Sequence, residues 1–464
     1  MRLPVIAQYR FPILRWSLPF ALTAALVGLS VATPEAVQAP SRQQRNVVIV
    51  TIDTLRADRL SGYGYRRPTS PNIDRILAAG ARFAEARTVE PLTTPALGSM
   101  ITSRYPHEHG ASRNGLRLRS GFASLPKALQ AHGYRTAAFI GNWTLRDKLS
   151  GLGEHFEVFT EVLNRRRWLG LIRGEATAED LTAEALDWLE AHNSSKPRQP
   201  FMLWVHYVEP HAPYRLWSEH REPLGITTAG NPSESDRYDT EIAYVDHWVG
   251  ELLRKIEPLS PKERTLVVVT SDHGESLGEH NYWGHGRHLY EPSLRIPLGI
   301  QWTGNIAPQV VESPALIIDL APTILGLLGQ RSPAGFQGYD WTSVLSGGRA
   351  PQDRLTLYQA HRGAVISGHD SDLRRQAGLL AVGSLIGNRK EVVRIENGRR
   401  HVFDLGNDPR ELIDLMAGSK EPPSEAVLEW LNAVANGLTL MDEELPEALD
   451  QESAQKLRAL GYVD

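Results

Sequence analysis

Short apolar runs rich in β-branched residues recur along the chain, and two of them end in carboxylates. Leu266–Val269 is one such run, and residues 46–52 form another. Both are predicted to be buried strands, because continuous apolar runs of this length are typical of strands covered on both faces. Asp272 and His273 follow the first run, and Asp53 follows the second. Two strands that each end in an acid predict the ligand crevice of an open α/β sheet.

The rest of the pattern alternates between strands and helices. Further strands are predicted over 136–140 and 201–208. Helical spacing of apolar or small residues predicts helices over 72–79, 96–102, 125–131, 178–191, 238–256 and 317–328. The polar stretch 218–237 is predicted to be a surface loop. These elements together predict an α/β fold with helices flanking a large, mostly parallel sheet.

The pattern changes beyond Pro333. Four short strand-like pieces with Gly and Asn turns follow, at 355–358, 379–382, 392–396 and 400–403. They predict a small antiparallel sheet, and 423–434 is predicted to be a helix. We therefore expect a catalytic domain over 46–331 and a C-terminal α+β subdomain over 332–464.

Composition narrows the class of protein. A length of 464 residues with 41% hydrophobic and 22% charged residues is ordinary for a large globular enzyme with an appended subdomain. The net charge of -4 argues against nucleic acid as a partner, since the chain has no basic surplus to neutralise phosphates. The chain has no cysteine, which excludes disulfides, thiolate metal sites and cysteine nucleophiles.

The N-terminus has the pattern of a targeting segment. Arg2, Arg10 and Arg15 precede an uncharged apolar stretch over 18–33, and small residues at 37–39 offer a cleavage site. Residues 1–39 are predicted to be a signal peptide, with an uncleaved membrane anchor as the alternative. Either interpretation predicts an exported protein that is periplasmic, extracellular or membrane-anchored.

Asp272 and His273 are candidate metal ligands, because a carboxylate beside an imidazole suits a divalent cation. The alternative is that Asp272 is only the N-cap of a helix. His285, between two glycines, is a further imidazole in the same stretch. His211 lies just beyond a predicted strand and is expected in the crevice, whereas His206 alternates with apolar neighbours and is compatible with a core position.

Thr93 and Thr94 precede Pro95 at the start of a predicted helix. A hydroxyl there lies at the positive end of the helix dipole, which favours a developing anion. The alternative is that one of the two threonines simply caps the helix.

Six motifs together resemble the sulfatase family of the alkaline-phosphatase superfamily, over roughly residues 46–415. They are TIDTLRAD at 51–58, TTPALGSMITSRYPHEHG at 93–110, EPHAPY at 209–214, TSDHGESLGEHNYWGHG at 270–286, DLAPTILGLLG at 319–329 and FDLGNDPRELIDL at 403–415. The resemblance implies an alkaline-phosphatase-like α/β sandwich. It also implies that Asp53, Asp272 and His273 hold a divalent metal ion together with Thr93, which falls on the family's nucleophile position.

The nucleophile window departs from the family pattern. Sulfatases have a cysteine or serine there, oxidised to formylglycine within a Cys-x-Pro-x-Arg signature, whereas residues 93–97 read TTPAL. No formylglycine is therefore expected.

Thr54 stands where many sulfatases have a second metal-binding aspartate, and Asn142 stands near the position of a family lysine. These departures resemble the threonine-nucleophile branch of the superfamily, in which an asparagine downstream of the threonine binds phosphoryl oxygens. Asn114, 21 residues after Thr93, fits that role.

The leading hypothesis is metal-dependent hydrolysis of a phosphate or, less favoured, a sulfate ester through a covalent Thr93 intermediate. Asn114 would bind the transferring group. His211 and His285 would hold that group, protonate the leaving oxygen or complete a second metal site. The residue types leave the metal open among Mn²⁺, Zn²⁺, Ca²⁺ and Mg²⁺. Thr94 is a rival nucleophile. The alternative functions are an atypical sulfatase and an inactive binder of sulfated or phosphorylated polymers.

Overall fold

The computed structural model describes residues 45–163, 165–167, 172–227, 230–363 and 378–439. The predicted leader at 1–39 lies outside these residues, as does the end of the predicted C-terminal subdomain. Within the described ranges, none of the helices has the length and apolar character needed to span a bilayer.

An eight-stranded sheet, mostly parallel around its centre, organises the fold. Its strand order is β13-β2-β12-β9-β1-β8-β4-β5. In that order the strands span Gln309–Val311, Ala81–Phe83, Leu298–Gln301, Thr265–Ser271, Asn46–Ile52, Phe201–Tyr207, Arg135–Ile140 and Val158–Glu161. β1 pairs in parallel with both β8 and β9, whereas β12 runs antiparallel to β9 and β2. The predicted fold class is confirmed.

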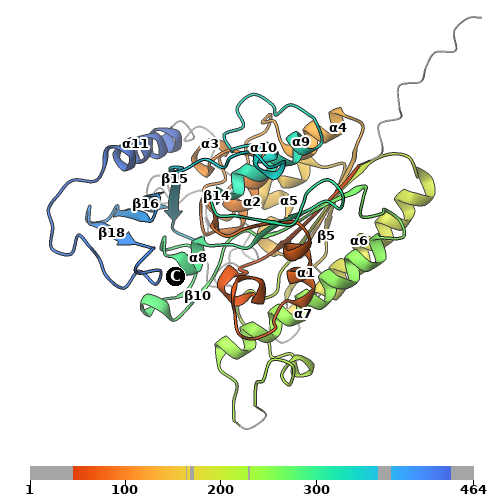
Figure 1. Ribbon diagram of the computed structural model, residues 1–464, viewed down its shortest axis with the longest axis horizontal. Coiled ribbons are helices and arrows are strands. Elements are labelled where there is room, and N and C mark those ends of the chain that lie inside the picture. Colours follow the sequence, from red (N-terminus) through yellow and green to blue (C-terminus); the bar gives the residue numbers. More distant parts are fainter. Residues whose placement is uncertain (1–44, 164, 168–171, 228–229, 364–377, 440–464) are drawn as a thin grey trace, which may run out of the picture. The chain divides into compact units, whose positions relative to one another are not determined.

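Helices cover both faces of this sheet. Val48 and Val50 of β1 pack in one core with the helices α1 (Pro71–Ala79), α6 (Ala178–Ser195) and α7 (Glu234–Ile256). Val47 and Ile49 pack in the other core with α2 (Thr93–Thr102), α4 (Leu125–Ala131) and α9 (Leu320–Leu327). Successive side chains of a strand point to opposite faces, so a continuous apolar run feeds both cores. Figure 1 shows α6 and α7 lying side by side.

The helices lie close to their predicted positions, with one correction. The stretch 218–237 was expected to be a loop throughout, but α7 already begins at Glu234. The cause is a capping box: the Ser233 side chain accepts from the Asp236 N–H, and the Asp236 carboxylate accepts from the Ser233 N–H. The short helices are α3 (Pro106–His109), α5 (Asp147–Ser150), α8 (Glu291–Leu294) and α10 (Thr342–Leu345).

The C-terminal segment forms the predicted four-stranded antiparallel sheet, drawn in dark teal and blue in Figure 1. Its strands are β15 (Thr356–His361), β16 (Leu379–Ile386), β17 (Arg389–Arg394) and β18 (Arg400–Asp404). Trp430 and Val434 of α11 (Glu425–Thr439) pack with Val382 and Val393 of this sheet. Smaller two-stranded pairs are β14 (Ala315–Leu316) with β3 (Ala86–Arg87), and β6 (Arg165–Arg167) with β7 (Ile172–Glu175).

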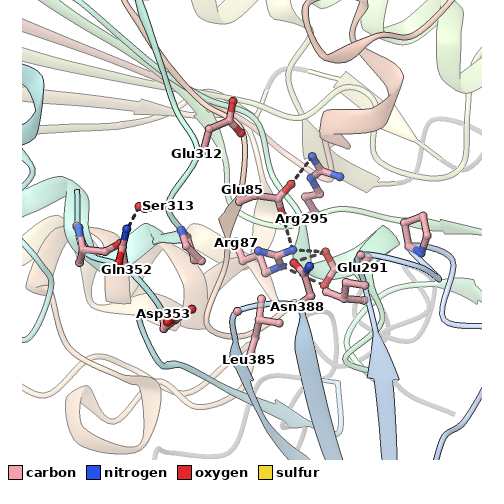
Figure 2. Close-up of a pocket in the computed structure, with 16 residues that line it drawn as sticks. Glu85, Arg87, Glu291, Arg295, Glu312, Ser313, Gln352, Asp353, Leu385 and Asn388 are labelled. Atoms are coloured by element: carbon pink, nitrogen blue, oxygen red, sulfur yellow. Dashed lines mark hydrogen bonds and ion pairs between the residues drawn. The ribbon is translucent and has the colours of Figure 1, made fainter. Parts of the chain in front are cut away.

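A buried charge network links β3 and α8 to the C-terminal sheet. Arg87 donates through Nε and Nη2 to Glu291, and Lys390 of β17 donates to the same carboxylate and contacts Glu411. Burial alone would raise the pKa of Glu291, but the Arg87 and Lys390 cations lower it below its ordinary value. Figure 2 shows Arg87 between Glu291 and Glu85 at the edge of a cavity of about 580 Å³. This network fixes α8, which follows the motif at 270–286, against the C-terminal sheet.

His109 supports the first turn of α2 in a neutral form. The Ala111 N–H donates to its Nδ1 at 3.2 Å, so Nε2 carries the ring proton and donates to the Pro95 carbonyl at 3.2 Å. The side chain is fully buried, and burial lowers its pKa to about 3. Protonation of Nδ1 would place a second N–H against the Ala111 amide.

We therefore expect His109 to make the protein sensitive to acid. Unfolded His109 takes up a proton below its ordinary pKa of 6.5, whereas folded His109 does so only near a pKa of about 3. Its contribution to the free energy of unfolding is thus lost as pH falls, by about 1.4 kcal/mol per pH unit, or about 2 kcal/mol near pH 5. Urea unfolding with chelator should show a shallower decline for His109→Gln. Exposed His132→Gln should keep the parent slope, and equal slopes for His109→Gln and parent would contradict the assignment.

Candidate active site

The ends of three neighbouring parallel strands deliver the central side chains of the site. Ile52 of β1 is in register with Ser271 of β9 and with Tyr207 of β8. Asp53 and Asp272, one residue further along, are therefore brought side by side, and the Asp53 N–H donates to the Tyr207 carbonyl at 2.9 Å. The crevice predicted from the two apolar runs lies at this edge of the sheet.

A buried carboxylate–imidazole cluster forms there. Ligand atoms of Asp53, His206 and Asp272 all lie within 4.8 Å of one another, and the three side chains are fully buried. His273 Nε2 lies 3.3 Å from Asp272 Oδ2 and 4.0 Å from Asp53 Oδ1. Burial, and then the charge of Asp53, raises the pKa of Asp272 well above its ordinary value.

These residues fit a divalent cation. Among the residues that the structure describes, Asp272 Oδ2 and His206 Nε2 have no hydrogen-bond partner, although both are buried. Leaving such atoms unpaired is costly, and two adjacent carboxylates repel one another, so a positive ion at this point would offset both costs. Oxygen and imidazole nitrogen ligands together suit Mn²⁺ or Zn²⁺, and the carboxylates alone would also accept Mg²⁺ or Ca²⁺.

His206 is a further candidate metal ligand, although its sequence pattern predicts a core position. Its Nε2 lies 3.6 Å from Asp53 Oδ2, and its Nδ1 lies 2.8 Å from Thr51 Oγ1. Thr51 and His206 are register partners on β1 and β8. With Nδ1–H donating to Thr51, Nε2 presents its lone pair to the cluster, the arrangement common in metal-binding histidines. The only signal in the sequence was one ionisable residue within an apolar strand.

We expect His206→Gln to weaken divalent-metal binding by at least about tenfold, because one imidazole ligand is lost from the cluster. Titration calorimetry of the metal-stripped protein with Zn²⁺ and with Mn²⁺ measures this directly. His192→Gln, which changes a buried histidine of α6 that bonds the Gln199 carbonyl, is the control. Unchanged affinity in His206→Gln would remove His206 from the ligand set.

Two further side chains shape the cluster. Asn142 donates through Nδ2 to Asp53 Oδ2, and its Oδ1 accepts the Thr144 N–H at 2.8 Å, which fixes the orientation of the amide. Thr54, which has no carboxylate to offer, adopts a left-handed φ of 55° and donates its N–H to Asp272 Oδ1 at 3.2 Å. Asn142 thus lies in contact with the ligand set, and its place near the position of a family lysine was the signal for this role.

Thr93 is the hydroxyl that faces the cluster. It begins α2, is fully buried, and its Oγ1 lies 3.4 Å from His273 Nε2. The Thr94 hydroxyl instead donates to the Thr144 carbonyl at 3.2 Å. Consecutive helical residues are rotated by about 100°, so only one of two adjacent threonines can point at a given site.

Asn114 lies beside the two threonines. Its Oδ1 accepts the Thr94 N–H at 3.0 Å, so its Nδ2 is directed elsewhere. Within the described ranges Nδ2 has no hydrogen-bond partner, although the side chain is fully buried. A fixed and unsatisfied donor next to a hydroxyl at a helix N-terminus suits an anionic oxygen of a substrate.

His211 and His285 face one another at the edge of the cluster. Their Nε2 atoms lie 3.4 Å apart, and the His285 ring lies 4.2 Å from the His273 ring between centroids. The Nδ1 of His285 lies 3.1 Å from the Pro91 carbonyl, and that of His211 lies 2.7 Å from the Ala212 carbonyl. Both Nδ1 atoms therefore act as donors, and the two Nε2 lone pairs can share one proton. Burial, followed by the nearby His273, lowers the pKa of His285 well below its ordinary value.

A cleft of about 500 Å³ opens at this histidine pair. Its lining includes both imidazoles and Glu275, a fully buried carboxyl whose pKa is raised to about 8 chiefly by burial. No role for Glu275 is predicted from the sequence. The cleft shares no lining residue with the cavity in Figure 2, which is lined by Arg87, Glu291 and, from the C-terminal sheet, Leu385.

The fold and the site define a hydrolase of the alkaline-phosphatase-like class, with a candidate metal centre at the strand ends. The chain belongs to the sulfatase family, since the family model "Sulfatase" matches residues 45–330. The resemblance noted from the six motifs is confirmed, and membership of this family of hydrolytic enzymes agrees with the predicted class of activity.

Known relatives are distant but cover most of the chain. The N-acetylglucosamine-6-O-sulfatase of Bacteroides thetaiotaomicron is 25% identical, over 72% of this chain and 77% of the relative. Human arylsulfatase A is 26% identical, over 73% of each chain.

Two solved structures share the fold. One is a protein in complex with its substrate D-glucosamine-2-N,6-O-disulfate (TM-score 0.69, 20% identity, 86% of this chain and 99% of that chain). The other is the phosphonate monoester hydrolase of Agrobacterium radiobacter (TM-score 0.66, 18% identity, 86% and 96%).

Proposed function

We propose that the protein is a metal-dependent esterase that transfers the phosphoryl group of its substrate first to Thr93 and then to water. One observation carries this proposal: the buried Thr93 hydroxyl lies 3.4 Å from His273 Nε2, beside the carboxylate–imidazole cluster. With no cysteine in the chain, a formylglycine made from cysteine is excluded, and a threonine hydroxyl occupies the corresponding position.

Asp53, His206, Asp272 and His273 would hold the divalent cation. When bound, the ion supplies Lewis acidity, which lowers the pKa of the Thr93 hydroxyl so that its proton is lost to solvent, and which neutralises charge on the transferring group. The protein's own contribution is to hold these ligands in a dry crevice at the strand ends, where electrostatic interactions are strong.

In the first step, Thr93 Oγ1 attacks phosphorus, and a new Oγ1–P bond forms as the bond to the leaving oxygen breaks. Asn114 Nδ2 donates to a non-bridging oxygen, which stabilises the charge that gathers there. The positive end of the α2 dipole acts in the same direction. The anionic ester opposes the low pKa of His285, so the His211–His285 pair takes up one proton from solvent as the substrate binds and passes it from Nε2 to the leaving oxygen.

In the second step, a water molecule attacks the phosphoryl group on Thr93. The histidine pair, now without its extra proton, accepts one proton from this water as the new P–O bond forms. The Oγ1–P bond breaks, Thr93 is regenerated, and phosphate or its monoester is released. The two steps return the histidine pair to its starting state.

Sulfate-ester hydrolysis is the second candidate, and the sulfatases among the relatives favour it. A sulfuryl group has the same tetrahedral arrangement of oxygens, so the Thr93, Asn114 and histidine contacts would serve it in the same way. The phosphonate monoester hydrolase among the structural neighbours supports the phosphoryl alternative only at the level of the fold.

A substrate panel distinguishes the two. Protein stripped of metal is reloaded with Mn²⁺, Zn²⁺, Mg²⁺ or Ca²⁺ and assayed with an aryl phosphodiester, a phosphonate monoester, a phosphate monoester and a sulfate ester. Metal-dependent turnover of phosphoryl substrates supports the leading proposal. Turnover of the sulfate ester alone would replace it by the second candidate, and no turnover of any ester would contradict both.

We further propose that residues 1–39 direct export and that residues 332–464 form a C-terminal subdomain. The sequence pattern supports both, and the export proposal predicts that the mature protein is found outside the cytoplasm. Cell fractionation that recovers active enzyme only from the cytoplasm would contradict it.

A further inference from the structure

The cleft at the histidine pair has an exposed aromatic side chain on its wall. Trp283 is 57% exposed and is the one aromatic residue among the large exposed apolar side chains of the described chain. It lines the same cleft as His211 and His285, which the proposed mechanism places at the leaving oxygen. An indole held open to water beside a reaction centre leaves a large apolar surface without a partner.

The hairpin that contains Trp283 supports its indole ring from one side. Trp283 and Gly284 form β11, which pairs with β10 (Ser276–Leu277) in a short hairpin. In the turn, Gly278 has a φ of 104°, and a Cβ built there would lie 3.1 Å from the indole. The indole therefore rests on the bare backbone of Gly278, and a side chain at that position would push it away.

The same hairpin is tied to the reaction centre. The Tyr282 hydroxyl donates to the His285 carbonyl at 2.6 Å. Gly286 approaches Leu92, the residue before Thr93, so closely that a Cβ would lie 2.8 Å from the leucine side chain. Trp283 is thus held in place relative to both the proposed acid and the proposed nucleophile.

We propose that Trp283 is a specificity-determining residue whose indole stacks against a six-membered ring in the leaving group of the ester. This inference rests on the proposed function of the site. Aromatic faces stack with rings at a useful gain in affinity, and an indole offers the largest such face. The wall of the cleft also carries the polar side chains of Tyr214, Glu275 and Arg287, which suit hydrogen bonds to ring substituents.

An aryl ring and a pyranose share this stacking chemistry, and matched esters separate them. In metal-loaded enzyme, kcat/KM is measured for phenyl, hexose and methyl esters of the same acid. For each ring ester, the ratio of its kcat/KM to that of the methyl ester should fall by about tenfold in Trp283→Ala if that ring stacks on the indole, chiefly because KM rises. This is the fold-change that corresponds to a stacking energy of about 1.4 kcal/mol. Trp283→Phe should recover most of the ratio. Ile386→Ala, an exposed apolar residue of β16 outside the cleft, is the control.

Equilibrium binding tests the same inference without turnover. Calorimetric titration of phenyl phosphate and of glucose 6-phosphate compares Thr93→Ala with the Thr93→Ala/Trp283→Ala double variant. Affinity for at least one ring compound should fall by about tenfold in the double variant, and the compound affected identifies the ring as aryl or pyranose. Equal affinities for both compounds would overturn the role of Trp283, whereas an absence of turnover in the parent enzyme would overturn only the proposed function.

Discussion

Thr93→Ala is expected to lower kcat for the preferred ester by about 10⁴-fold or more, because removal of a covalent nucleophile leaves only binding and electrostatic stabilisation. Metal affinity should change far less, since the carboxylate and imidazole ligands remain. Steady-state kinetics with saturating metal measure the first effect, and calorimetry measures the second. A variant that both binds metal and lacks turnover separates the role of nucleophile from that of ligand.

Thr94→Ala is the matched control for this experiment. The Thr94 hydroxyl donates to the Thr144 carbonyl and does not face the cluster. Its loss should therefore lower the free energy of unfolding by about 1 kcal/mol and leave kcat nearly unchanged. Thr93→Ser should retain part of the activity, because it preserves the oxygen. If Thr93→Ala kept a large fraction of parental turnover while Thr94→Ala did not, the nucleophile would be Thr94.

Asp272→Asn is expected to weaken metal binding by about 100-fold or more, because it removes one of the two charged ligands. The same change should stabilise the metal-free protein. Burial, followed by the charge of the adjacent Asp53, raises the pKa of Asp272, so a neutral amide avoids the cost of an ionised carboxyl at this buried position. The two opposite effects distinguish a metal ligand from an ordinary buried acid.

Thermal unfolding measures both the loss of metal binding and the gain in stability without metal, and it needs no substrate. In chelator, Asp272→Asn should have a higher Tm than the parent. With excess metal, the Tm of the parent should rise, because the ion binds only the folded state. The Tm of the variant should rise little. Asp246→Asn, at a buried acid that accepts N–H groups of Asn72 and Ile73, should keep the parental response to metal. A full metal response in Asp272→Asn would remove Asp272 from the ligand set.

The long elements followed from the sequence because their signals are local. The runs at β1, β8 and β9 are continuous and apolar, and the helices α1, α4 and α6 have clear spacing. The short strands β2, β12 and β13 went unpredicted. They span only three or four residues, too few for any periodicity, and their strand character comes from the neighbours they pair with.

The sequence by itself determined the family, the fold class and the delivery of Asp53, Asp272 and His273 to strand ends. It also excluded cysteine chemistry and pointed to Thr93. These conclusions rest on residue identity and on order along the chain, which motifs and strand patterns record directly.

Only the tertiary structure showed that His206 and Asn142 lie beside Asp53. It also showed that the Thr93 hydroxyl, and not that of Thr94, faces the cluster. His206 lies near the cluster because β8 pairs with β1 in the register that sets it beside Thr51. Thr93, and not Thr94, faces His273 because of the rotation of the first turn of α2. Strand register and helix rotation are fixed by packing between distant segments, so no local pattern in the sequence encodes them.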